Sequence, residues 1–230
     1  MTTLLAFDTA SERMTIALTS HGRSRSHVAV GGAKASATLI PSILALLNEG
    51  GTTLAAVDAI AFGRGPGAFT GLRTACSVAQ GLAFGADKPV IPVDNLLAVA
   101  ETARAGRQRF HVWATIDARM DQIYAAEYRF DAGRWQELHA PMLTDCEQLA
   151  ERWKLDPPSA VAGDALSVFG TRMQVGDAER MPDARLEPAS LLLLATQAWN
   201  VGAVVDAASA LPLYVRDKVA ETTAEREARR

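Results

Sequence analysis

Gly63-Arg64-Gly65-Pro66-Gly67-Ala68-Phe69-Thr70-Gly71-Leu72-Arg73 is the segment that says most about how this chain folds. It lies between an apolar run, Ala59 to Phe62, and a helical pattern that begins near Thr70. Glycine allows positive φ angles and close backbone approach, and a glycine-rich turn that leads into a helix can bind an anion. The segment lacks the Lys-Ser/Thr of a P-loop and the glycine spacing of a dinucleotide fingerprint. By its residues alone, it is either a tight structural turn or a ligand loop.

Length and composition limit the classes of protein that this chain can be. Its 230 residues are 49% hydrophobic, which is enough for one large domain or for two lobes of about 100 residues each. The formal net charge is -3, whereas a chain that binds nucleic acid alone usually carries a basic field. We therefore expect any role with RNA to need a partner that supplies the positive surface.

The cysteines and the apolar runs indicate a cytoplasmic protein. Cys76 and Cys146 have no CxxC neighbour, which is typical of reduced thiols in the cytosol. No basic segment precedes the first acid, Asp8, and this argues against a signal peptide. The longest apolar run, 189–199, is interrupted by polar residues and is too short to span a membrane.

Apolar periodicity and breaker residues predict the elements of the first half of the chain. The expected strands are 4–7, which ends at Asp8, and 14–19, 23–30, 59–62 and 89–93. The expected helices are 33–48, bent at Pro41; 70–84, closed by Gly85; and 95–104, capped by Asp94.

The same pattern recurs after a polar boundary at 105–109. Leu5-Ala6-Phe7-Asp8 and Ala114-Thr115-Ile116-Asp117 both read as an apolar strand that ends at an aspartate before a tight turn. The expected later elements are strands 112–116, 122–130, 135–143 and 160–163, helices 146–153 and 189–200, a surface loop 176–188 and an extended segment 212–216. We therefore predict an internal duplication with lobes 1–104 and 105–219, followed by a disordered tail at 220–230.

Four strings together are similar to one known family. They are Phe7-Asp8-Thr9-Ala10, the glycine segment 63–73, Ile116-Asp117-Ala118-Arg119-Met120 and Pro212-Leu213-Tyr214-Val215-Arg216. In this order and at these distances, the chain resembles the TsaB (YeaZ) family over nearly its whole length except the tail. The resemblance implies an α/β fold with two ribonuclease-H-like lobes and a cleft between them, as in the actin/Hsp70/sugar-kinase (ASKHA) group and the glycoprotease-like M22 family.

The resemblance also implies a function through partners. It implies a heterodimer with the catalytic paralogue TsaD, recruitment of the ATPase TsaE, and transfer of a threonylcarbamoyl group to the tRNA adenosine next to the anticodon. On this view the chain reaches tRNA only through the complex. ATP and metal belong to the partner subunits, and the chain has no cofactor of its own.

The residues themselves provide no metal site in the place where the paralogue has one. TsaD holds its metal with two histidines at i and i+4 on one helix face. Asn95 and Val99 occupy these places here, and valine cannot bind a metal. The histidines of the chain are scattered, at His21, His27, His111 and His139. We predict no catalytic residue and no metal ligand.

The first hairpin turn, Asp8-Thr9-Ala10-Ser11, lies where actin-like ATPases wrap phosphate. Those enzymes use glycine at the place of Ala10, whose Cβ hinders the closest approach. Asp8 and Ser11 either meet a hydrated cation or stabilise the turn, and the same choice applies to Asp117, with Arg119 as an ion-pair partner. The predicted vestigial nucleotide or phosphate loops contain Asp8, Thr9, Ser11, Gly65, Gly67 and Asp117.

Two helices carry the predicted partner surface. Small residues recur at Gly71, Ala75, Ala79 and Ala83, and this stripe packs either on its own sheet or on another helix. The first helix is apolar over a broader arc than one sheet needs. The resemblance implies that both helices pair with TsaD, and the same surface would allow a homodimer in its absence. The predicted contact residues are Leu39, Ile43, Leu46, Gly71, Ala75, Val78, Ala79 and Leu82.

Three functions remain open at this point. The leading hypothesis is a non-catalytic subunit that stabilises TsaD. The alternative is an autonomous ATPase or kinase, which needs a phosphate cradle in both lobes. A peptidase would need a metal or a nucleophile in a recognisable setting, and the sequence offers neither.

Overall fold

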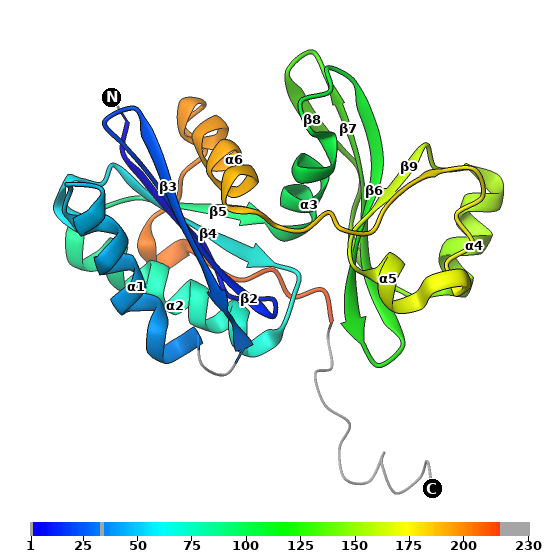
Figure 1. Cartoon of the computed structure of the whole chain (residues 1–230), viewed down its shortest axis with the longest axis horizontal. Coiled ribbons are helices and arrows are strands. Elements are labelled where there is room, and N and C mark those ends of the chain that lie inside the picture. Colours follow the sequence, from blue (N-terminus) through cyan, green and yellow to red (C-terminus); the bar gives the residue numbers. More distant parts are fainter. Residues whose placement is uncertain (1, 33–34, 217–230) are drawn as a thin grey trace, which may run out of the picture.

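The computed structural model describes residues 2–32 and 35–216, so the predicted tail at 220–230 lies outside the described residues. The first lobe contains one five-stranded sheet in the order β3-β2-β1-β4-β5 (Figure 1). β1 pairs antiparallel with β2 and parallel with β4, and β5 continues the parallel side. The strands are β1 (Leu4–Asp8), β2 (Arg13–Ser20), β3 (Arg23–Val30), β4 (Ala59–Gly65) and β5 (Val90–Asp94).

The second sheet repeats the first strand by strand. Its order is β10-β9-β6-β7-β8, in which β6, β7 and β8 are antiparallel and β9 and β10 run parallel to β6. Each strand thus corresponds to the one five places earlier in the chain, and this confirms the predicted duplication. The strands are β6 (Phe110–Arg119), β7 (Gln122–Asp131), β8 (Arg134–Thr144), β9 (Ala160–Ala162) and β10 (Glu179–Met181).

The helices follow the same repeat. α1 and α4 connect the third strand of each sheet to the fourth, α2 and α5 connect the fourth to the fifth, and α3 and α6 follow the fifth. The helices are α1 (Ala35–Glu49), α2 (Phe69–Ala86), α3 (Asn95–Arg104), α4 (Cys146–Leu155), α5 (Ala165–Phe169) and α6 (Pro188–Asn200). Short 3-10 turns lie at η2 (Leu54–Ala56), η3 (Gly170–Arg172) and η4 (Ala207–Ser209).

The last helix of each repeat packs against the other lobe. α1 and α2 cover one face of the first sheet, and α6, from the second repeat, covers the opposite face (Figure 1). In return, α3 places Leu96, Val99 and Ala100 in the core of the second sheet. After α6 the chain stays with the first lobe, where Val205 pairs with Val90. The segment from α6 to Val205 therefore packs on the first sheet, although it follows the second sheet in the chain.

Several predicted elements also need correction. Gly85 lies inside α2, which ends at Ala86 and is followed by Asp87 in the left-handed conformation. Asp94 precedes α3 but makes no capping hydrogen bond, because its carboxylate pairs with Arg64. The predicted loop 176–188 contains β10, and α5 was not predicted. In the described part of the chain, no helix has the length and apolar character that crossing a membrane requires.

Candidate functional site

A cleft of about 660 Å³ lies between the lobes, and both repeats line it with the ends of their strands. The first lobe contributes the β1–β2 turn and the glycine segment, and the second contributes the β6–β7 turn and the start of α5. The chain also brings residues 213–216 to this cleft. Of the predicted loop residues, the lining includes Asp8, Ser11, Gly67 and Asp117.

The glycine segment packs directly on the first hairpin turn. The Ala68 amide donates to the Ala10 carbonyl at 2.8 Å, and the Thr9 hydroxyl donates to the Gly71 carbonyl at 2.7 Å. A Cβ on Gly67 would lie 2.7 Å from the Ala10 oxygen, and one on Gly71 would lie 2.0 Å from the Thr9 oxygen. These glycines are therefore required for the contact between two loops of the chain itself.

Asp8 is the buried centre of this contact, with 1% of its surface exposed. One carboxylate oxygen accepts the Ala10 amide at 3.0 Å, and the other accepts the Asn95 side-chain amide at 3.1 Å. Burial raises the pKa of Asp8 to about 6, although these hydrogen bonds and one from the Thr9 amide oppose the rise. Asn95 also accepts the Gly65 amide at 3.2 Å, so it joins the turn, the glycine segment and α3.

The second lobe repeats this device with a more open turn. Asp117 accepts the Arg119 amide at 2.8 Å, two residues on, as Asp8 accepts that of Ala10. The Asp117 amide in turn donates to the Asp164 carboxylate at 2.9 Å. Burial raises the pKa of Asp164. The sequence reasoning missed Asp164. The duplication could have indicated it, because Gly163-Asp164 comes at the end of β9 and Gly63-Arg64 comes near the end of β4.

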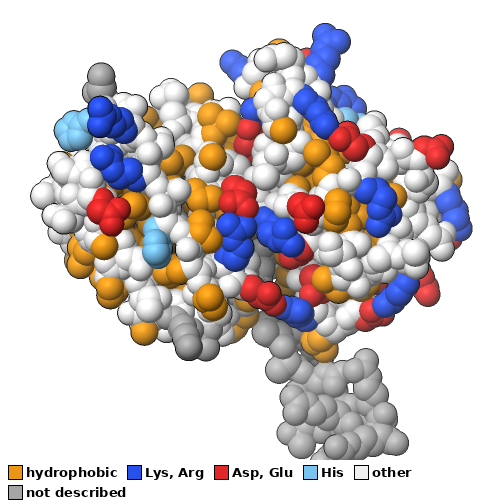
Figure 2. All heavy atoms as spheres, viewed as in Figure 1, with side chains coloured by type: hydrophobic (Ala, Val, Ile, Leu, Met, Phe, Trp, Pro, Cys, Tyr) orange, Lys and Arg blue, Asp and Glu red, His pale blue; other side chains and the backbone are white. Residues whose placement is uncertain are grey.

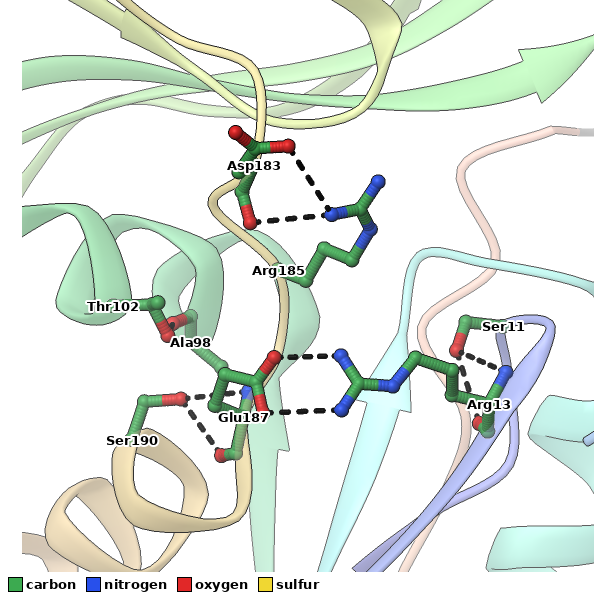
Figure 3. Close-up of polar contacts among 8 residues, drawn as sticks. All are labelled: Ser11, Arg13, Ala98, Thr102, Asp183, Arg185, Glu187 and Ser190. Atoms are coloured by element: carbon green, nitrogen blue, oxygen red, sulfur yellow. Dashed lines mark hydrogen bonds and ion pairs between the residues drawn. The ribbon is translucent and has the colours of Figure 1, made fainter. Parts of the chain in front are cut away.

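Ion pairs join the two repeats at the mouth of the cleft. Arg119 binds Glu12 at 2.7 Å and Asp117 at 3.1 Å, as expected for an ion-pair residue. Arg13 on β2 makes a two-pronged contact with Glu187, at 2.6 and 3.2 Å (Figure 3). Glu187 also forms a capping box with Ser190 at the start of α6, so this pair holds the returning helix to the first lobe.

Residues 213–216 tie the lobes together on the side of the glycine segment. The Leu213 amide donates to the Arg64 carbonyl at 2.7 Å. Arg216 donates to the Ala118 carbonyl at 2.9 Å and to the Gln122 side chain at 2.8 Å, in and beside the β6–β7 turn. The string 212–216, quoted for the resemblance, therefore acts as a strap between the two repeats.

Three backbone amides at the phosphate-loop positions are engaged within the chain. A phosphate loop needs backbone amides that point at the ligand. Here the amides of Thr9 and Ala10 donate to Asp8, the Ala68 amide donates to Ala10, and Ser11 exchanges hydrogen bonds with Arg13. Asp8 therefore stabilises the turn, which is one of the two roles expected for it.

Metal-binding side chains and cysteine thiols are the groups that a metallopeptidase or a cysteine peptidase would use. Within residues 2–32 and 35–216, no three His, Cys, Asp or Glu side chains converge as metal ligands would. Asn95 and Val99 occupy the places where the paralogue has its histidines. The Asn95 side-chain amide donates to Asp8, and Val99 is buried. Burial raises the pKa of both cysteine thiols, which leaves them poor nucleophiles.

Six of the eight predicted contact residues lie in the interior of the first lobe. Leu39, Ile43, Leu46, Gly71, Ala75 and Ala79 are buried, and Val78 and Leu82 are half-buried beside the same core. The small-residue stripe of α2 thus packs on its own sheet, because a helix in an α/β lobe must bury one face there. The outer faces of α1 and α2 consist of other residues.

Comparisons with known proteins agree with this fold over nearly the whole chain. A family model described as TsaD, tRNA N6-adenosine threonylcarbamoyltransferase, matches residues 19–224. The tRNA threonylcarbamoyladenosine biosynthesis protein TsaB of Haemophilus influenzae is 35% identical over 227 residues, covering 94% of each chain. TsaB of Escherichia coli is 34% identical over 94% of this chain and 96% of its own.

A solved structure extends the match to three dimensions. The structure of YeaZ from Pseudomonas aeruginosa is 39% identical and superposes with a TM-score of 0.84, covering 93% of this chain and 100% of its own. This confirms the predicted two-lobed α/β fold and the resemblance drawn from the four strings. The chain belongs to the TsaB (YeaZ) family.

Proposed function

We propose that this chain is a non-catalytic partner subunit that binds and stabilises TsaD during threonylcarbamoylation of tRNA in the cytoplasm, with TsaE joining the complex. The names of its relatives support a role in making threonylcarbamoyladenosine. The observation that carries the partner role is the outer surface of α1 and α2. The residues at the phosphate-loop positions form hydrogen bonds with one another, and this favours a partner subunit over an autonomous ATPase.

The outer face of α1 is apolar and almost uncharged. Ile40 is 42% exposed and Leu44 is 53% exposed, and Ala37, Pro41 and Ala45 are exposed beside them. The helix has no charged residue before Glu49. A helix that faces water usually carries charged residues on its exposed side, so this face is suited to contact with another protein.

The outer face of α2 adds an aromatic ring and small residues. Phe84 is 85% exposed. Ser77, Gly81 and Gly85 are also exposed, and they recur every four residues along one side of the helix. A Cβ on either glycine would meet nothing within 4 Å, so the packing of the chain itself does not require them. Small residues on an open helix face allow the helix of a partner to approach closely.

The test places charge on this surface without disturbing the core. Ile40→Arg combined with Leu44→Arg should lower the affinity for TsaD at least 100-fold in calorimetric titration, because two cations would enter a desolvated interface. Leu155→Arg on α4 is the matched control, because Leu155 is 90% exposed on the other lobe. This control should bind as the natural chain does.

The design separates folding from binding. Both variants should unfold at the same denaturant concentration as the natural chain, since all three positions are exposed. Full association of the double variant with TsaD would show that α1 does not form the contact. Ala79→Arg is unsuitable for this purpose, because Ala79 is 0% exposed and the change would disrupt the core.

A further inference from the structure

One half of a sheet face in the second lobe is polar, basic and uncovered. β6 and β7 point Trp113, Ile123 and Ala125 toward α4 and α5. Side chains alternate along a strand, so the same face continues through His111 on β6 and Arg129 on β7. Arg129 lies beside His111 and beside Gln136 of β8 in the strand register. We call this region, with Arg107, Arg109, Arg129 and Arg134, the arginine face.

The arginine face is open to solvent. Arg109, Arg129 and Arg134 are exposed. A hollow of about 520 Å³ lies along the sheet here, lined in part by Arg107, Arg109 and Arg129. In Figure 2, Lys and Arg side chains stand out at the end of the second lobe where β7 turns into β8. Within the described residues, Arg129 and Arg134 make no hydrogen bond or ion pair, so their guanidinium groups are available to a ligand.

The acids nearby leave a positive excess. Asp131 pairs with Arg109, and Glu179 pairs with Arg107. Glu127 lies on the same face between Ala125 and Arg129, but it is buried and accepts hydrogen bonds from His111 and His139. Four arginines thus meet two exposed carboxylates and one buried carboxylate. The whole chain has a net charge of -3, but the Debye length of about 10 Å at 0.1 M salt screens its distant acids.

The existing ion pairs can be exchanged for contacts with a ligand. In the Arg109–Asp131 pair, 85% and 57% of the two side chains are exposed. In the Arg107–Glu179 pair, these fractions are 39% and 49%. Exposed pairs of this kind contribute little net stability. Phosphate can therefore replace the carboxylates as partners of the two arginines.

The chemistry favours nucleic acid over a protein or a lipid. None of the exposed large apolar side chains of the described residues belongs to this face, whereas protein interfaces have an apolar core and membrane-binding surfaces insert apolar groups. Arginine presents a planar fork of donors that matches phosphate oxygens. Cations spread over several strands suit a ligand whose charges are also spread out.

We propose that the arginine face binds the phosphate backbone of RNA. The choice of tRNA as that RNA rests on the proposed function, whereas the surface itself does not depend on it. This inference revises the expectation that any positive surface must come from a partner. The net charge of the chain conceals a local excess, because the arginines come from two stretches, 107–109 and 129–134, that meet only in the folded sheet.

Fluorescence anisotropy of the full-length chain with a labelled, unmodified tRNA transcript tests the proposal. Four phosphate contacts predict a slope of about -3 in a plot of log affinity against log salt, at roughly 0.7 to 0.9 per contact. Arg129→Glu with Arg134→Glu should weaken binding at least tenfold and make the slope shallower. The control is Arg23→Glu with Arg25→Glu on β3, which makes the same change of charge on the other lobe. Its affinity should stay within twofold of the natural chain.

Any of the following outcomes would overturn the proposal. Absence of binding by 100 µM chain at low salt would do so, as would equal weakening by both double variants, which would indicate a response to net charge alone. Binding to vesicles that contain phosphatidylserine, but not to the transcript, would assign the face to a membrane. Titration with TsaD separates this test from that of the proposed function, because the Arg129/Arg134 variant should still bind TsaD and the Ile40/Leu44 variant should still bind RNA.

Discussion

Gly71 shows how single residues close the site. The first turn of α2 lies so near the β1–β2 turn that the Thr9 hydroxyl reaches the Gly71 carbonyl at 2.7 Å. Any side chain at this place would lie 2.0 Å from the Thr9 backbone oxygen. The Cβ would be fixed by the backbone of a helix, and the Thr9 oxygen belongs to the backbone of a hairpin. Neither can therefore move aside easily. Gly71 therefore serves to bring the two loops together.

Gly71→Ala should destabilise the chain by about 3 kcal/mol, since its Cβ would force these loops apart. Gly81→Ala on the same helix is the matched control, because a Cβ there meets nothing within 4 Å. It should stabilise the chain by about 0.5 to 1 kcal/mol through the better helix propensity of alanine. Urea unfolding of both variants measures the difference. Equal stabilities would mean that the loops are not in contact.

Asp8 makes the stability of the chain depend on pH. Its pKa is raised from 3.8 to about 6, so between these values the folded state holds more protons than the unfolded state. Stability is then lost as pH rises through this window, and the loss is complete above about pH 6. Asp8→Asn removes this titration. The natural chain should therefore lose about 2 kcal/mol relative to the variant between pH 4 and pH 7.

Denaturant unfolding of the natural chain and of Asp8→Asn at several pH values measures this change in stability with pH. A stability difference that does not change with pH would show that Asp8 is not buried as the structure has it.

At the level of elements, the sequence predicts most strands and helices, since apolar alternation and helical spacing record which faces are buried. It fails where tertiary contacts decide. Gly85 resembles a helix terminator, yet α2 continues to Ala86 because the following Asp87 adopts the left-handed conformation with a φ of 54°. β10 has three residues, Glu179–Met181, without an apolar pattern, and its pairing with β9 defines it.

Gly85→Ala distinguishes the two accounts of this helix end. In the structure Gly85 is helical and a Cβ would meet nothing within 4 Å, so alanine should raise the free energy of unfolding by about 1 kcal/mol. If Gly85 instead ended the helix with a positive φ, alanine would lower it by about the same amount. Thermal unfolding measured by circular dichroism decides the sign.

Across the whole molecule, the sequence indicates the duplication but not the exchange of helices. The repeated pattern of strand, aspartate and turn is local, so it can be read from residues such as Asp8 and Asp117. The crossing of α3 and α6 to opposite sheets depends on contacts between residues far apart in the chain. Helical spacing also could not distinguish the interior positions on α1 (Leu39, Ile43 and Leu46) from surface ones, since α1 is apolar on both its inner and outer sides.

The exchange gives the molecule two lobes that cannot be separated without exposing a core. The strap at 213–216 and the Arg119–Glu12 pair add contacts across the cleft between them. At the first turn, the Ala68 amide donates to the Ala10 carbonyl, and the Thr9 and Ala10 amides donate to Asp8. These contacts are the ground on which we prefer a partner role to an autonomous ATPase.

Calorimetric titration of the isolated chain with ATP and magnesium, with hydrolysis measured in parallel, tests this account most directly. Because the Thr9 and Ala10 amides donate to Asp8 and the Ala68 amide donates to the Ala10 carbonyl, we predict no submillimolar binding and no steady hydrolysis. Submillimolar binding with sustained turnover would contradict the account, because it would require these loops to open around a nucleotide.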